Sequence, residues 1–170
     1  KIKDDILNLK ESSLYQERVQ NNVFPVIGEG SHEAKIMFIG EAPGKNEAAT
    51  GKPFCGASGK VLTELIESIG LQRQDVYITN IVKDRPPNNR DPLPEEVAQC
   101  MPYLQRQIAQ VEPKLILALG RVAAQNLLHV KTPIRKLREK TFYLGESKIP
   151  LIATFHPAYF RFLLHHPSET

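Results

Sequence analysis

The sequence feature that most constrains the fold is a recurring unit: a short apolar segment, a loop rich in glycine or proline, and a helical pattern. The apolar segments occupy residues 34–39, 76–82, 114–119 and 148–155. Each is shorter than a stable helix and is typical of a buried strand. Strands that alternate with helices form a parallel sheet with helices on both faces. We therefore expect an α/β fold, a three-layer α/β/α sandwich with a central four-stranded parallel sheet.

The spacing of apolar residues between these segments predicts the helices. We expect them at residues 2–19, 60–69, 95–111, 122–128 and 156–165, with Gly70 ending the second. Residues 141–144 precede the fourth strand and are interpreted as its hairpin partner. Because no linker-like stretch interrupts the series, residues 1–170 are expected to form a single domain.

Composition narrows the class of protein. The chain has 22 Lys and Arg against 19 Asp and Glu, a formal net charge of +3, which permits a nucleic-acid partner without requiring one. Two cysteines, Cys55 and Cys100, are too few for a disulfide framework and fit a reducing, cytoplasmic location. Apolar runs are too short to span a membrane, and residues 1–10 lack the apolar core of a signal peptide.

The loops that follow the strands are the expected working surface. In a parallel sheet, ligands bind beyond the carboxyl ends of the strands. Residues 40–59, 80–90, 120–121 and 155–159 lie at those ends and are rich in glycine, proline and polar side chains. The glycine spacing in residues 40–59 matches neither a phosphate-binding loop nor a dinucleotide fingerprint, which argues against an enzyme acting on nucleotide phosphates.

Individual residues in these loops each allow two interpretations. Glu41 suits an acid or base, or is a solvated carboxylate at a strand exit. Phe54 fills the core or offers a face on which a base stacks. Asn80 ends a turn or reads the edge of a pyrimidine, because its amide donates and accepts side by side. His156 begins a helix or donates a hydrogen bond to a developing oxyanion.

The loop motifs taken together resemble the family-4 uracil-DNA glycosylases. The resemblance rests on the Gly40–Gly44 motif, Phe54, Asn80-Ile81-Val82-Lys83 before residues 85–90, and His156-Pro157-Ala158-Tyr159. These motifs match in identity, order and spacing, and the similarity runs from about Leu7 to Tyr159. The fold that the resemblance implies is a parallel sheet between helices, in agreement with the pattern of strands.

The resemblance also implies roles for residues. Gly40 and Glu41 would lie against a flipped uracil and its sugar, with Glu41 the favoured catalytic carboxylate. Phe54 would stack on uracil, Asn80 would read its polar edge, and His156 would hydrogen-bond O2 as the base departs. The reaction would be hydrolysis of the N-glycosidic bond in uracil-containing DNA, single- or double-stranded, by a monofunctional enzyme. Apart from the resemblance, the loops carry basic side chains that either form a solvated face or hold DNA phosphates: Arg85, Arg90, Arg135, Lys136 and Arg138.

The sequence departs from the family at the positions of an iron–sulfur cluster. The resemblance implies four cysteine ligands, and the corresponding positions hold Leu9, Ser12, Asp84 and Cys100. One thiolate cannot hold a cluster that needs four ligands, so we expect no cofactor and no metal. Cys55 lies in the active-site loop and does not replace the missing ligands.

Two other departures concern the chemistry. The family often has an acidic pair where this chain reads Glu47-Ala48, so Glu47 is the remaining candidate for activating water. Related glycosylases that trap the sugar covalently carry an inserted loop with a nucleophilic histidine, and residues 85–94 contain none. We therefore expect hydrolysis without covalent trapping of the sugar. We also expect a monomer. The alternative is a catalytically weakened uracil- or DNA-binding module.

Overall fold

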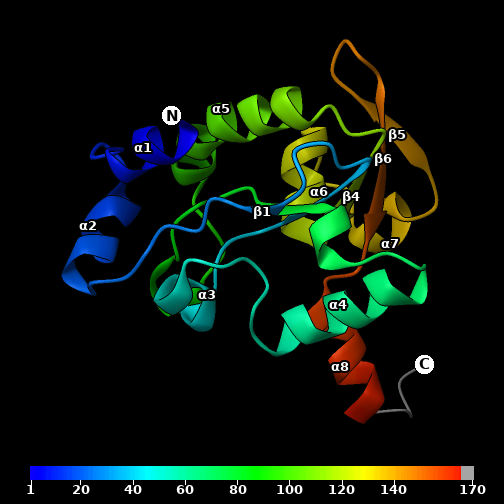
Figure 1. Ribbon diagram of the computed structural model, residues 1–170, viewed down its shortest axis with the longest axis horizontal. Coiled ribbons are helices and arrows are strands. Elements are labelled where there is room, and N and C mark those ends of the chain that lie inside the picture. Colours follow the sequence, from blue (N-terminus) through cyan, green and yellow to red (C-terminus); the bar gives the residue numbers. More distant parts are fainter. Residues whose placement is uncertain (166–170) are drawn as a thin grey trace.

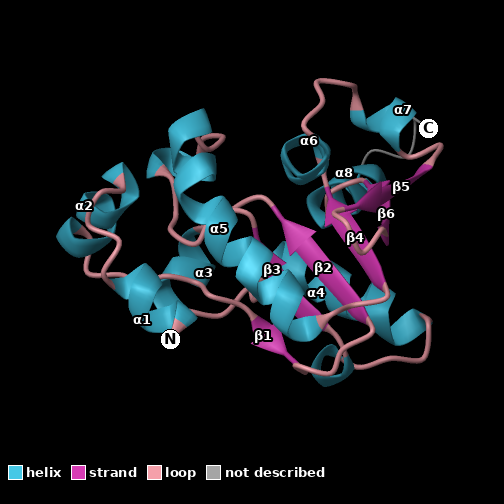
Figure 2. Ribbon diagram, turned by 90° about the horizontal axis from the view of Figure 1, so that it is seen from above, coloured by secondary structure: helices cyan, strands magenta, loops and turns pink. Residues whose placement is uncertain are grey.

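The structure, a computed structural model that describes residues 1–165, is built on a mixed sheet with strand order β1-β3-β2-β4-β6-β5 (Figures 1 and 2). The four inner strands are parallel, as expected: β3 (Tyr77–Asn80), β2 (Ile36–Gly40), β4 (Leu115–Leu119) and β6 (Ile149–Thr154). The sheet is nevertheless six-stranded, because an antiparallel strand is added at each edge: β1 (Glu29–Gly30) beside β3, and β5 (Thr141–Leu144) beside β6. The sequence pattern predicts the hairpin partner but not the two-residue β1.

Helices cover both faces of the sheet, which confirms the α/β/α sandwich (Figure 2). Successive side chains of a strand point to opposite faces. In β2, Met37 and Ile39 accordingly pack against α5 (Pro94–Val111), α6 (Arg121–Leu128) and α7 (Ile134–Leu137), whereas Phe38 packs against α4 (Ala57–Ser68). The last described helix, α8 (Pro157–His165), packs against α4 on that second face. No helix within the described residues is long and apolar enough to cross a membrane.

The expected helix over residues 2–19 is wrong, because the structure has two helices there. They are α1 (Ile2–Leu7) and α2 (Ser13–Gln20). Ser12 separates them: its Oγ accepts a hydrogen bond from the Leu14 N–H at 3.3 Å and so caps α2. A serine that satisfies a free backbone N–H in this way favours a helix start over continuation of a helix.

The long loop after β2 is more ordered than the sequence suggests. It contains a short helix, α3 (Lys45–Thr50), and α4 begins at Ala57, three residues before the expected position. Two 3₁₀ turns, η1 (Arg73–Asp75) and η2 (Pro87–Asn89), flank β3. The sheet and these short elements place the loops after β2, β3 and β6 on one end of the molecule.

Candidate active site

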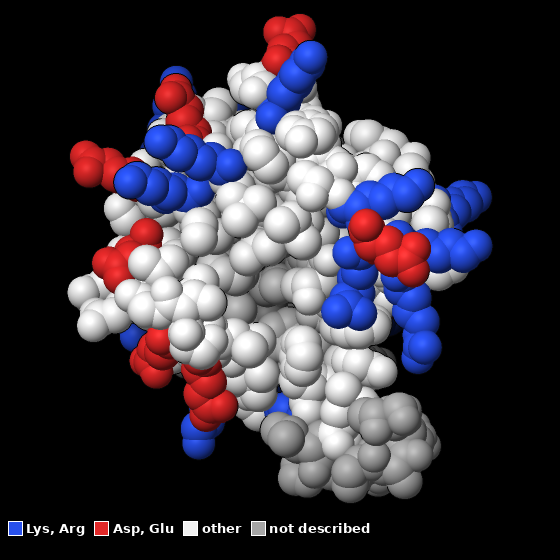
Figure 3. Space-filling view, turned by 90° about the vertical axis from the view of Figure 1, so that its right-hand side faces the viewer, with Lys and Arg blue, Asp and Glu red and all other residues white. Residues whose placement is uncertain are grey.

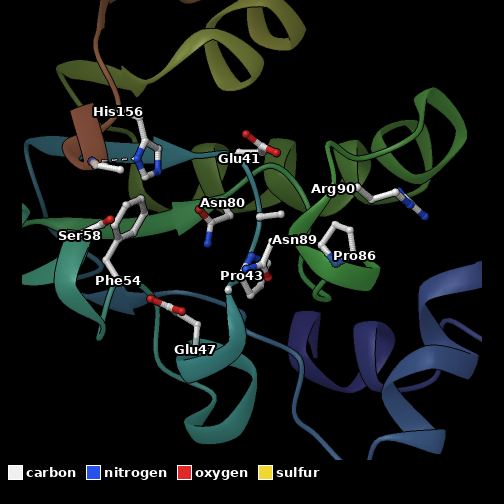
Figure 4. A pocket seen from close by; sticks show the side chains of 13 residues that line it. Glu41, Pro43, Glu47, Phe54, Ser58, Asn80, Pro86, Asn89, Arg90 and His156 are labelled. Atoms are coloured by element: carbon white, nitrogen blue, oxygen red, sulfur yellow. Dashed lines mark hydrogen bonds between the residues drawn. The ribbon is translucent and has the colours of Figure 1, made fainter. Parts of the chain in front are cut away.

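A pocket of about 430 Å³ opens at the carboxyl ends of the parallel strands. The chain runs from β2 to β3 on one side and later returns to β4 on the other, so this end contains the point at which strand order reverses. Such a switch point is where ligands bind in open α/β sheets. The pocket is lined by Glu41, Ala42, Pro43, Gly44, Glu47, Phe54, Ser58, Asn80, Pro86, Asn89, Arg90, His156 and Ala158 (Figure 4).

Gly40 lets two of the predicted binding residues come together. A Cβ at this position would lie 2.5 Å from Asn80 Oδ1 and 2.6 Å from Phe54 Cζ. Both distances are far shorter than van der Waals contact. The absence of a side chain at Gly40 is therefore what allows the Phe54 ring and the Asn80 amide to meet at the pocket floor.

Asn80, the last residue of β3, presents an unused acceptor. Its side chain is only 2% exposed, and its Oδ1 makes no hydrogen bond to any of the described residues. A buried polar atom without a partner is costly, so one inside a pocket indicates a place for a ligand donor. Figure 4 shows Asn80 facing the space between Phe54, His156 and Glu47.

Lys83 holds the backbone of Asn80 from the interior. Its fully buried ammonium donates to the Asn80 carbonyl at 2.7 Å, to Thr79 Oγ1 at 2.7 Å and to Gln107 Oε1 at 2.6 Å. The Thr79 hydroxyl itself donates to the Ile27 carbonyl, so it accepts from Lys83. Burial lowers the pKa of Lys83 to about 7, while three acceptors match the three protons of the charged form.

His156 is held in one tautomer. Its Nδ1 accepts a hydrogen bond from the Ala158 N–H at 3.1 Å, shown by the dashed line in Figure 4. Burial lowers the pKa of His156, so the ring is neutral near pH 7 and its proton resides on Nε2. Gly120 allows the ring to sit close, because a Cβ there would lie 3.0 Å from the His156 Cβ. The site thus contains a neutral imidazole N–H donor.

Glu41 is the carboxyl group with the most perturbed environment in the pocket. Burial is the main cause that raises its pKa to about 7, and the negative charge of Asp91, with which it shares a hydrogen bond, adds to the effect. Arg121 opposes this shift and holds Asp91 in an ion pair of 2.7 Å. Near neutral pH, Glu41 therefore exchanges readily between acid and carboxylate.

Glu47 comes from α3 on the opposite side of the pocket. Its Oε1 accepts a hydrogen bond from the Gly56 N–H at 3.3 Å, which fixes the carboxylate. Its charge acts on His156 and partly counteracts the lowering of the histidine pKa. The neighbouring Ala48 is buried within the fold. The position at which the family often has a second acid thus contributes only packing here.

The predicted cations are divided between two places. Arg90 lines the pocket, with both terminal nitrogens bonded to Glu96 at 2.9 and 2.7 Å, and Arg85 donates to Asn89 Oδ1 beside it. The other three are exposed on or just after α7: Arg135, Lys136 and Arg138. At the right of Figure 3, several basic side chains lie close together around an acidic one.

The residues at the implied cluster positions do not fit an iron–sulfur cluster. Ser12 caps α2, and Asp84 forms a buried ion pair of 3.3 Å with Arg18, which also donates to the Leu7 carbonyl. Cys100 is buried, and burial raises the pKa of its thiol, which disfavours the thiolate needed for ligation. In the part of the chain that the structure describes, no three His, Cys, Asp or Glu side chains are grouped to hold a metal.

The sequence interpretation assigns no role in the pocket to Lys83, Asp91, Arg121 or Gly120, although it places Lys83 in a motif and residues 120–121 in an expected site loop. A lysine that directly follows the apolar residues Ile81 and Val82 is a signal for a buried amine. Asp91 and Arg121 carry no such signal. They come near Glu41 only through tertiary contacts between segments 30 or more residues apart.

The geometry describes a site for a small planar ring with polar edges. It offers an aromatic face, a buried acceptor, a neutral N–H donor and two carboxyl groups around one space. A donor placed where negative charge develops, together with carboxylates that stabilise positive charge or activate water, suits cleavage of a bond that leaves an anionic ring.

Comparisons with known proteins show the family to which most of the chain is similar. The family model of the uracil DNA glycosylase superfamily matches residues 27–168. The chain is 46% identical over 160 residues to the type-4 uracil-DNA glycosylase of Archaeoglobus fulgidus, covering 91% of this chain and 78% of that protein. It is 47% identical over 164 residues to the type-4 enzyme of Saccharolobus solfataricus, with 92% and 74% covered. Identity to the type-5 uracil-DNA glycosylase of Thermus thermophilus is 36% over 150 residues, with 78% and 68% covered.

Proposed function

The chain belongs to the uracil DNA glycosylase superfamily, and we propose on this basis that it hydrolyses the N-glycosidic bond of uracil in DNA and leaves an abasic site. It is a glycosidase that acts in DNA repair. The observation that carries the assignment of the site is the meeting of Phe54, Asn80 and His156 around one pocket with an unused buried acceptor. A module that only gripped the DNA backbone would not need this pocket.

Binding would begin with a flipped base. Extrusion of uracil from the helix costs a few kcal/mol, least in a mispair or a single strand. The ring would stack on Phe54, and the Asn80 Oδ1 would accept the imide N–H that uracil presents, which satisfies the buried oxygen. Lys83 supports this step because it holds the Asn80 carbonyl from behind.

Bond cleavage would place negative charge on the uracil and positive charge on the sugar. The Nε2–H of His156 donates to O2 of the departing base, and the ring remains neutral because Nδ1 is already an acceptor. Glu41 in its ionised form stabilises the sugar cation. Glu47 orients the water that adds to C1′ and accepts the proton that this water loses, while the uracil anion, released from C1′, takes up a proton from solvent. Preorganised donors and charges of this kind are the main source of catalysis in comparable sites.

The pocket lining supports a monofunctional reaction. A glycosylase that also cleaves the strand needs an amine to attack the sugar, and none of the 13 described residues that line the pocket is a lysine. Lys83 is turned to the interior, with all three ammonium protons donated. The expected product is an intact strand with an abasic site.

The absence of an iron–sulfur cluster is part of the proposal. It rests on the chemistry of the four positions, which supply a leucine, a capping serine, an arginine-paired aspartate and one buried thiol. We infer that packing and the Arg18–Asp84 pair stabilise this region instead. No step of the reaction involves the cluster.

The DNA contacts, the oligomeric state and the location of the protein complete the proposal. Arg135, Lys136 and Arg138 would meet DNA phosphates from α7, with Arg85 and Arg90 nearer the pocket. The protein would act as a monomer. It would form one domain, since the six strands of the described residues belong to one sheet. Its two free thiols agree with a cytoplasmic location. Light scattering of the purified protein tests the monomer.

The reaction is tested with a labelled oligonucleotide that contains one uracil. After incubation with the protein, alkali should cleave the strand at the uracil position, and no cleavage should occur without alkali. The matched oligonucleotide with thymine should stay intact. Strand cleavage without alkali would contradict the monofunctional proposal. Binding of the uracil strand without any abasic product would favour the binding module.

A further inference from the structure

Phe54 has an unusual backbone conformation at the point where its ring enters the pocket. Its φ is +45°, in the left-handed region that bulky side chains avoid. Outliers of this kind persist only where surrounding contacts hold them, and they gather at binding sites. Phe54 is 7% exposed, and its ring lies against Gly40. The conformation thus directs the ring into the pocket wall.

The contacts that hold this conformation come from Arg73, in the η1 turn. Its Nη1 donates to the Phe54 carbonyl at 3.1 Å, and its Nη2 donates to the Pro53 carbonyl at 2.8 Å. Nη1 also donates to Thr63 Oγ1 of α4 at 3.3 Å. A planar guanidinium that binds two successive carbonyls fixes the peptide between them, which a lysine cannot do with one nitrogen.

Helix α4 completes the clamp from the other side. Gly59, in its first turn, lies so close that a Cβ there would overlap the Phe54 carbonyl carbon and oxygen. Thr63, one turn later, donates to the Gly59 carbonyl at 2.9 Å and accepts from Arg73. The backbone of Phe54 is thus enclosed between α4 and the guanidinium.

The Phe54 ring reaches two other members of the site. Its centroid lies 5.7 Å from that of the His156 ring, with 30° between the two planes. The Phe54 ring also lies next to Gly40, beside the Asn80 side chain. A change in the Phe54 backbone would therefore move the ring on which uracil stacks. The same movement would change the contact between this ring and His156.

We propose that Arg73 is a positioning residue for uracil recognition: it clamps the Pro53 and Phe54 carbonyls and so fixes the Phe54 ring as the stacking wall of the pocket. The inference rests on the proposed function and extends it to a residue outside the pocket. Without the guanidinium, the Phe54 backbone relaxes toward negative φ and the ring loses its place. Uracil then binds more weakly and reacts more slowly, although His156, Asn80 and the carboxyl groups remain.

A purely structural role would have a different signature. Arg73 also ties η1 to α4, and its loss would lower stability in either case. A stabilising arginine would weaken uracil binding and excision to the same degree whether or not residue 54 carries an aromatic ring. A positioning arginine acts through that ring, so its effect disappears when the ring is absent.

The experiment is a double-mutant cycle with Arg73→Ala, Phe54→Ala and the combined variant. Two quantities are measured on folded protein: the single-turnover excision rate and the dissociation constant of free uracil from calorimetry. Gln74→Ala is the matched control and should match the parent, because Gln74 is on the same turn and, among the described residues, its side chain bonds only to Gln72. Arg73→Ala should lower both rate and uracil affinity about 10-fold, the order expected for a displaced stacking surface.

In the Phe54→Ala background, the same arginine substitution should change both quantities less than about 2-fold. Equal effects in the two backgrounds, or no effect in the parent, would overturn the proposal. If Arg73→Ala does not fold, Arg73→Lys replaces it. This variant should lose less excision rate and less uracil affinity, and both losses should again disappear in the Phe54→Ala background. A parent that binds free uracil but excises none would contradict the proposed function, and the affinity arm would still test Arg73.

Discussion

The Nδ1 of His156 accepts a hydrogen bond of 3.1 Å from the N–H of Ala158, at the start of α8. This single contact decides which nitrogen of the neutral ring carries the proton. Because Nδ1 is an acceptor, the proton is on Nε2. The helix that follows β6 therefore supplies both the position of the histidine and its tautomer, and a donor is ready before any substrate arrives.

The excision rate should depend on pH through Glu41. The pKa of Glu41 is raised to about 7, and the ionised form is the one that stabilises the sugar cation, so the rate should rise with pH through about 7. One pH unit below that value it should be about 10-fold below its plateau. Single-turnover rates between pH 5.5 and 8.5 measure this, and Glu41→Gln should remove the acid limb.

The charge of Asp91 should set the position of that limb. Asp91 and Arg121 are the charged groups that act on Glu41, with Asp91 raising its pKa and Arg121 lowering it. Asp91→Asn removes a negative neighbour, so the midpoint should move to lower pH while the plateau changes little. A pH profile identical to that of the parent would show that Asp91 does not act on Glu41.

Asn80→Asp should impair the selection of uracil. The Oδ1 of Asn80 is buried and unpaired within the described structure, and a carboxylate in its place accepts hydrogen bonds only and repels the anion that develops on the base. The single-turnover rate on uracil should fall by about 100-fold, with binding of undamaged DNA unchanged. Excision at the parent rate would exclude Asn80 from base recognition.

The outlines of this site are predictable from sequence, because strand patterns place loop residues at one end of a parallel sheet. Gly40, Phe54, Asn80 and His156 are predicted and do meet there. What cannot be predicted depends on long-range contacts. Asp91 reaches Glu41 across 50 residues of sequence, and the tautomer of His156 depends on the exact start of α8. The start of α2 depends on one serine hydroxyl.

The Arg18–Asp84 pair should be essential to stability in the region where the resemblance implies cluster ligands. Both side chains are almost fully buried, so removing one partner leaves an uncompensated charge. Asp84→Leu should lower the free energy of unfolding by about 3–5 kcal/mol, and the double variant with Arg18→Met should recover much of that loss. Urea unfolding of the parent, the single variant and the double variant measures this loss and its recovery.

The purified parent should be colourless, and a broad absorbance near ~400 nm with stoichiometric iron would contradict this.

The salt dependence of DNA binding should identify the basic surface. Arg135→Ala with Lys136→Ala removes two exposed cations of α7, and the log–log salt slope should fall by roughly 0.7–0.9 for each phosphate that is no longer neutralised. Lys35→Ala with Lys114→Ala removes the same charge from the amino ends of β2 and β4, opposite the pocket, and should leave the slope unchanged. Equal slopes for both pairs would mean that α7 is only a solvated face.

The most direct test of the account is the single-turnover rate of uracil excision by the parent and by His156→Ala. The parent should convert a uracil-containing oligonucleotide completely to the abasic product. His156→Ala should bind the same DNA with similar affinity and react about 10²–10³-fold more slowly, the usual loss for one donor to a developing anion. Excision by His156→Ala at the parent rate would contradict the donor role, and no excision by the parent would contradict the function itself.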